Sequence, residues 1–132
     1  MIDIRSDIKV GLSFSLRRGR LLIHHATIRA IGNPDYIRFL LKSREKHIAV
    51  QCCEAIDRDN FRVPELIEGD KYNFEISSSP FVSVIYKACG WDKETTYVVY
   101  GIVHEKYRLV DFDLTTAQVI NPDEFVDPEN AI

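Results

Sequence analysis

Cysteine and long apolar runs are both scarce in this sequence of 132 residues. There are three cysteines, Cys52, Cys53 and Cys89, and they form no C-x-x-C pair, which argues against a disulfide scaffold. Arg or Lys interrupts every apolar stretch before it reaches the roughly 18–20 residues of a membrane-spanning helix. The first residues carry Asp3 and Asp7 where a secretory signal would carry bases. We therefore expect a cytoplasmic protein that has no contact with a membrane.

Catalytic and cofactor-binding motifs are also missing. The sequence contains no G-x-S-x-G, no H-E-x-x-H and no phosphate-binding glycine loop. His24, His25 and His47 have no Cys or carboxylate at the spacing of zinc ligands. Asp111 and Asp113 share one face of a predicted strand, where paired carboxylates can bind Mg²⁺ or transfer protons, but a solvated strand face is the usual reason for such a pair. We predict no enzymatic activity, no metal and no cofactor.

The charge is unevenly distributed along the chain. The formal net charge is −3, and 45% of the residues are hydrophobic, enough for one compact core. Residues 1–60 hold eleven Lys or Arg and seven Asp or Glu, whereas residues 61–132 hold six and thirteen. A net charge of +4 in the first half and −7 in the rest is typical of a protein that presents one region to a polyanion.

The first half has the pattern of two strand pairs around a short helix. Apolar residues alternate with small polar ones over residues 10–16, and a turn at 17–19 leads into a second strand at 20–24. A short helix over 25–31 is predicted to end at Gly32, which is suited to a left-handed C-terminal position. Strands are predicted over residues 36–41 and 47–53, joined by a polar turn.

The second half begins after a polar connector at residues 57–60. We predict an edge strand at 61–64, a turn at 68–70, a strand at 71–76, and strands at 97–103 and 107–114. Between them lies a helix with Ser79 as N-cap, Pro80 at its first position and Gly90 at its end. The apolar face of this helix is predicted to contain Phe81, Val82, Val84, Ile85, Ala88 and Cys89.

The order of elements repeats. Helix, glycine, strand, Glu-Lys turn and strand occur once around Gly32 and Glu45-Lys46, and again around Gly90 and Glu105-Lys106. We therefore predict a β-rich α+β fold in which two strand–helix–strand–strand halves form one small barrel. Residues 1–60 are the basic half, residues 61–120 the acidic half, and residues 121–132 an acidic tail.

Residues 19–32, GRLLIHHATIRAIG, resemble the signature of AbrB-type swapped-hairpin transcription regulators. The shared pattern is a glycine, an alternating apolar strand, a short helix with an arginine, and a closing apolar-glycine pair. Tandem relatives of the MraZ kind carry two such units in one chain, which implies an AbrB-like barrel here. The chain is also similar to small uncharacterised proteins carried on bacterial mobile elements. The resemblance implies DNA contacts from the loop and strand near residue 19 and from the helical Arg29.

Arginine-rich surfaces suit duplex DNA because guanidinium groups make bidentate contacts with phosphates and guanine edges. We therefore predict a DNA-binding transcriptional regulator, with double-stranded DNA as partner of the basic half. The candidate contacts are Arg17, Arg18, Arg20, Arg29, Arg38, Lys42, Arg44 and Lys46.

Two alternatives stay open. In one, the chain is an assembly module in which basic and acidic halves of successive copies attach head to tail as a homo-oligomer, or the acidic half binds a protein partner. In the other, Trp91, Tyr97, Tyr100 and Tyr107 stack single-stranded bases, although core or interface roles are favoured because these residues lie in the acidic half.

Overall fold

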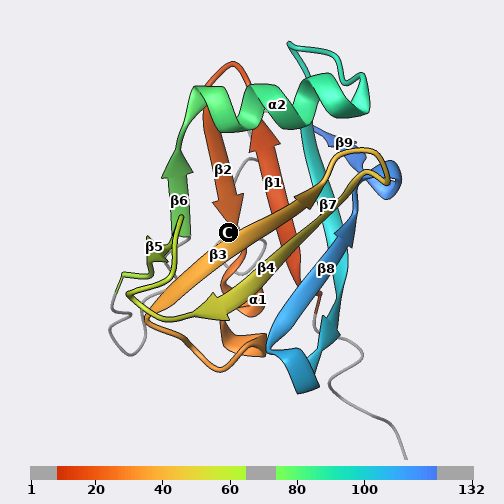
Figure 1. Cartoon of the computed structure of the whole chain (residues 1–132). Coiled ribbons are helices and arrows are strands. Elements are labelled where there is room, and N and C mark those ends of the chain that lie inside the picture. The colour runs from red at the N-terminus through yellow and green to blue at the C-terminus, as the bar shows by residue number, and fades with distance from the viewer. Residues whose placement is uncertain (1–8, 65–73, 122–132) are drawn as a thin grey trace, which may run out of the picture.

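The computed structural model describes residues 9–64 and 74–121, which form one curled antiparallel sheet with two α-helices (Figure 1). The β-rich α+β prediction is thereby confirmed. In chain order the elements are β1 (Gly11–Ser15), β2 (Arg20–Ile23), α1 (His25–Ala30), β3 (Tyr36–Lys42), β4 (His47–Cys53), β5 (Phe61–Arg62), β6 (Phe74–Ser77), α2 (Ser79–Cys89), β7 (Thr96–His104), β8 (Leu109–Asp113) and β9 (Gln118–Ile120). Two 3-10 turns, η2 (Glu105–Tyr107) and η3 (Leu114–Thr116), precede and follow β8.

The strand order is β5-β3-β4-β8-β7-β1-β2-β6, with β9 added on β7. α2 lies across one end of the curled sheet and α1 lies at the opposite end (Figure 1). We call these the α2 end and the α1 end. The hydrophobic core fills the inside of the curl, and its fully buried members include Leu12, Phe14, Ile48, Val99 and Phe112.

Most predicted elements occur at or near their expected positions, with three corrections. The N-cap of α2 is Ser78 rather than Ser79, because the Ser78 hydroxyl accepts the hydrogen bond from the Phe81 N–H. Val84 is 52% exposed, and the buried face of α2 contains Tyr86 in its place. The strand predicted at 107–114 starts at Leu109, because the chain forms η2 and then turns at Arg108, whose φ is 48°. The turn at 68–70, the first residues of the strand at 71–76 and most of the tail lie outside the described residues.

β7 connects the two parts of the sheet. Its first five residues pair with β1, and the residues from Gly101 to His104 pair with β8. At Gly101, where the pairing partner changes, a Cβ atom would lie 2.7 Å from the Asp111 carbonyl oxygen and 2.7 Å from the Phe112 ring. Only glycine fits this crossing without displacing a neighbour, so Gly101 allows the tight curl of the sheet.

α1 is attached to β1 through buried polar contacts. The Gly11 N–H donates to the Thr27 hydroxyl at 2.8 Å, and the same hydroxyl donates to the Gly11 carbonyl at 3.0 Å. The His24 Nε2 atom lies 2.8 Å from the Ser13 hydroxyl. These contacts give His24 a structural role, since its ring is buried beside β1.

α2 is held by Tyr86 and an aromatic cluster. The Tyr86 hydroxyl lies 3.0 Å from the Phe14 carbonyl oxygen and 2.6 Å from the Thr95 carbonyl oxygen. Trp91 stacks on Tyr97 with ring centroids 4.4 Å apart, and both rings contact Tyr86 edge-on. Trp91 and Tyr97 therefore pack against the core, as favoured above, and burial raises the pKa of Tyr86 to about 12.

Gly101→Ala should destabilise the protein. Its methyl group would meet the Asp111 backbone and the Phe112 ring, and overpacking of this kind costs about 1–3 kcal/mol. Ile102→Val, at the exposed neighbouring position, is the control and should change the free energy of unfolding by less than about 0.5 kcal/mol. Urea denaturation measures both; equal effects would show that Gly101 is not needed for the curl.

Tyr86→Phe should lower the free energy of unfolding by about 1–3 kcal/mol, because the carbonyl groups of Phe14 and Thr95 lose a buried donor. The raised pKa means that the protonated hydroxyl stabilises the fold fully below pH 10, and this contribution is lost between pH 10 and about 12. The difference between wild type and variant should therefore shrink over that range in denaturation curves. Tyr107→Phe, at an exposed position, is the control and should change the free energy of unfolding at neutral pH by less than about 0.5 kcal/mol.

Candidate nucleic-acid interface

Strands from the basic and acidic halves pair directly with each other. β1 pairs with β7, β2 with β6, and β4 with β8, all antiparallel. As a result, charges from both halves lie on the same sheet. Among the described residues, the strands of the two halves are therefore interleaved in one sheet and are not separated into a basic end and an acidic end.

Six of the eight candidate Lys and Arg residues lie on, or directly beside, two turns at the α2 end. The turn before β2 packs on the start of α2, where the Ser78 N–H donates to the Gly19 carbonyl at 2.9 Å. The turn between β3 and β4 lies against the C-terminal half of α2, since Arg44 shares a surface depression with Lys87. Arg17 and Arg18 lie on the first turn, and Arg20 is the first residue of β2 after it. Arg44 and Lys46 lie on the second turn, and Lys42 is the last residue of β3 before it.

The other two candidates lie elsewhere. Arg29 is in α1, at the opposite end of the sheet (Figure 1). Arg38 lies on β3, and its guanidinium donates two hydrogen bonds to the Gln51 side-chain oxygen at 3.0 and 3.1 Å. The eight predicted residues therefore do not form one continuous surface.

Two arginines at the first turn form ion pairs with glutamates of the second half. Arg17 lies 3.5 Å from Glu94, and Arg20 lies 3.1 Å from Glu75. All four side chains are well exposed, so these ion pairs contribute about 0–1 kcal/mol and can exchange for contacts with another anion. Arg18 is exposed on the same turn.

The second turn and α2 form what we call the hairpin-tip cluster, made of Lys42, Arg44, Lys46 and Lys87. Within residues 9–64 and 74–121, none of these four cations forms an ion pair with a carboxylate. A depression of about 470 Å³ lies between the turn and the helix, and it is lined by Ser43, Arg44, Val84, Lys87 and Ala88. Lys46 lies close enough to Cys89 to oppose the rise that burial causes in the pKa of that thiol.

Lys87 was not predicted as a site residue. It belongs to the acidic half, and its position 43 residues after Arg44 gives no sign of their proximity. The signal available in the sequence was its place on the polar side of an amphipathic helix, next to the exposed Val84.

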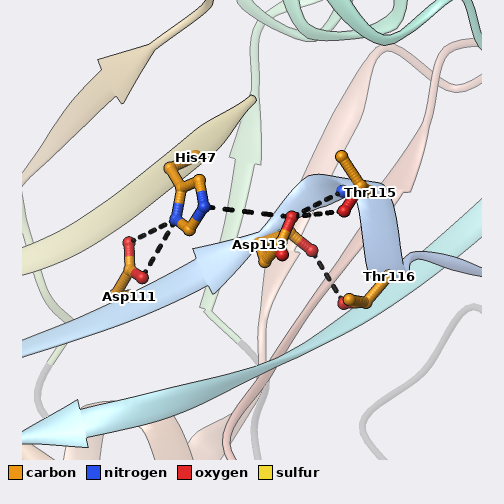
Figure 2. Close-up of polar contacts among 5 residues, drawn as sticks. All are labelled: His47, Asp111, Asp113, Thr115 and Thr116. Carbon is orange, nitrogen blue, oxygen red and sulfur yellow. Dashed lines mark hydrogen bonds and ion pairs between the residues drawn. The ribbon is translucent and has the colours of Figure 1, made fainter. Parts of the chain in front are cut away.

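A second polar cluster centres on His47 of β4 (Figure 2). Its Nδ1 atom lies 3.0 Å from an Asp111 carboxylate oxygen, and its Nε2 atom lies 3.9 Å from Asp113. Asp111 and Asp113 thus share one face of β8, as predicted. The Thr115 hydroxyl and N–H donate to the Asp113 carboxylate at 2.6 and 3.0 Å and hold its pKa below the usual value, with a smaller contribution from His47.

The contacts of this cluster link β4 to β8 and to the turn that follows β8. The described groups that contact the imidazole are the carboxylates of Asp111 and Asp113. In the described part of the chain, no group of three or more His, Cys, Asp or Glu side chains is arranged to hold a metal ion. The three cysteines form no disulfide and are partly exposed.

Thr115→Ala should raise the pKa of Asp113, because the carboxylate loses the hydroxyl donor that contributes most to its lowered value. The stabilisation from this carboxylate is present above its ordinary pKa near 3.8 and is lost as the pH falls through the lower folded value. NMR titration of the Asp113 side chain measures the change. Thr116→Ala is the matched control, because Thr116 bonds to the Asp113 backbone carbonyl and should leave the pKa in place. The backbone N–H of residue 115 and His47 remain in this variant, so the expected result is a partial rise, and an Asp113 pKa equal to that of the wild type would contradict this assignment.

Among residues 9–64 and 74–121 no helix has the length and apolar content needed to cross a membrane. No protein-family model, curated protein or solved structure matches this chain. The functional conclusion therefore depends on the geometry of the α2 end.

Proposed function

We propose that this protein is a non-enzymatic DNA-binding regulator whose α2 end contacts double-stranded DNA. The observation that carries the proposal is the hairpin-tip cluster, in which four cations from two separate segments have no carboxylate partner among the described residues. Phosphates of a duplex offer closely spaced negative charge to such a group. Arg44 and Lys87 supply the two cations that line the depression.

The spacing along α2 supports contact with a groove of the duplex. The exposed side of the helix contains Pro80, Ser83, Val84 and Lys87. Arg17 and Arg18 lie on the turn at its start, and the hairpin-tip cluster lies at its end. Eight residues of helix separate Ser79 from Lys87, roughly 12 Å at 1.5 Å per residue, and the major groove is about 12 Å wide. We propose that the two basic segments contact phosphates on either side of a groove that α2 faces.

We also propose that the fold is an internally repeated, AbrB-like barrel. Its support is the pairing pattern, in which β2 pairs with β6 and β4 with β8, while β1–β7 is matched by β5–β3. The hairpins β3–β4 and β7–β8 each have a four-residue connection that ends in a left-handed residue, Lys46 with φ 58° and Arg108 with φ 48°. These residues are 62 positions apart, close to the offset of the Glu-Lys pairs.

Head-to-tail assembly of basic and acidic halves remains the alternative prediction. The direct pairing of the two halves gives it less support, because both charges lie on one sheet. Sedimentation of the protein at rising salt tests it: assembly predicts oligomers that dissociate as salt rises, and a monomer at every salt concentration contradicts it.

Removing Arg44 and Lys87 together should weaken DNA binding and its dependence on salt. Each lost phosphate contact lowers the slope of log K against log salt by about 0.9, so Arg44→Ala/Lys87→Ala should lower it by about 1.8. Fluorescence anisotropy with a labelled duplex at several salt concentrations measures the slope.

Arg29→Ala is the matched control for this experiment, since Arg29 lies at the α1 end. It should leave the slope unchanged, and thermal unfolding should show that all variants are folded. No binding of the wild type at low salt would refute DNA binding. A loss of slope of about 0.9 in Arg29→Ala, the value for one phosphate contact, would refute the assignment to the α2 end.

A further inference from the structure

The depression between α2 and the β3–β4 turn has features that phosphates alone do not explain. Arg44 and Lys87 supply positive charge, but the aliphatic side chains of Val84 and Ala88 line the same space. Val84 is 52% exposed although it is a large apolar residue at the centre of the helix. A ligand that combines carboxylates with an apolar side chain fits both properties, because it pairs with the cations and covers the aliphatic surface.

The chain itself contains a segment of this composition. In residues 123–129, DEFVDPE, four acids flank the apolar pair Phe125 and Val126. No other stretch of seven residues in the sequence combines four acids with an aromatic residue and no base. Its charge is opposite to that of the hairpin-tip cluster.

The segment is attached near the α2 end. It follows Asn121, directly after β9, and Ile120 of β9 pairs with Thr96 at the start of β7. Thr95, the residue before β7, accepts a hydrogen bond through its carbonyl oxygen from the Tyr86 hydroxyl of α2, and Lys87 is the next residue of that helix. Asp127 and Glu129 are six and eight residues beyond Asn121. Extended chain of those lengths spans about 20 and 26 Å, which exceeds the radius of gyration of roughly 14 Å expected for a domain of this size. The depression is therefore within reach of residues 123–129 of the same chain.

We propose that residues 123–129 bind in the depression of their own chain, with acids against Arg44 and Lys87 and an apolar side chain against Val84. The segment then competes with DNA for the hairpin-tip cluster, and this second part rests on the proposed function. A tethered segment has an effective concentration in the millimolar range. If the segment binds the depression with a dissociation constant near 1 mM, it weakens DNA binding about two- to tenfold.

The test compares two variants of the full chain that change the net charge equally. Glu124→Gln/Asp127→Asn removes two acids from the segment, and Asp35→Asn/Asp59→Asn removes two exposed acids elsewhere. Amide NMR spectra without DNA should show shifts in the segment variant at Ser43, Arg44, Val84, Lys87 and Ala88, and none at these residues in the control. With DNA, the segment variant should bind about two- to tenfold more tightly than the control.

The two readouts separate the claims. Absence of shifts at the five depression residues, or equal shifts in the control, overturns the docking. Shifts that grow with protein concentration place the segment on a second copy and also overturn it, because the proposal is for the same chain. Shifts without any DNA binding support the docking and refute the proposed function, and shifts with unchanged DNA affinity overturn the competition.

Discussion

The arrangement of the molecule depends on one strand, β7, that pairs with two different neighbours along its length. Its first part is bonded to β1 and its last part to β8, so the two groups of strands curl around a single core. Gly101 permits the crossing because a side chain there would overlap the neighbouring strand. Tyr86 then joins α2 to the ends of both β1 and the segment before β7. The position of α2, and of every cation beside it, follows from these constraints.

The same constraint determines how charge is displayed. Because each strand pair of the basic half, β3–β4 and β1–β2, lies between strands of the acidic half, charges of opposite sign meet at the surface. Arg17 and Arg20 lie beside Glu94 and Glu75 and are partly neutralised. The hairpin-tip cluster has no such carboxylate partner among the described residues, and two of its members, Arg44 and Lys87, line one depression between the β3–β4 turn and α2. A small free group of cations, rather than the net charge of a half, is what the DNA-binding proposal needs. If an acidic segment covers these cations, it lowers the affinity of the same site for DNA.

Local patterns predicted most elements, and long-range contacts account for what was missed. Alternation over residues 10–16 predicted β1, and the turn at 17–19 predicted that residues 20–24 return as β2. Gly32 and Gly90 marked the ends of both helices. The prediction that Val84 is buried is wrong: the apolar residues of α2 cover more than one side of the helix, and their identity does not show which of them contact the core. The N-cap is Ser78 and not Ser79; both serines can cap a helix, so the residue type does not distinguish them. The proximity of Arg44 and Lys87 depends on how a turn meets a helix 43 residues later, which no local pattern encodes.

The central claim is that DNA contacts the α2 end, and mapping the contact on the protein tests it most directly. Amide NMR spectra recorded during titration with a short duplex should show the largest shifts in the exposed side of α2 and in the turns that contain Arg18 and Arg44. Residues of α1, including Arg29, should keep their resonances, because they lie at the opposite end of the sheet. Shifts concentrated in α1, or on the outer face of β3 around Arg38, would contradict the account.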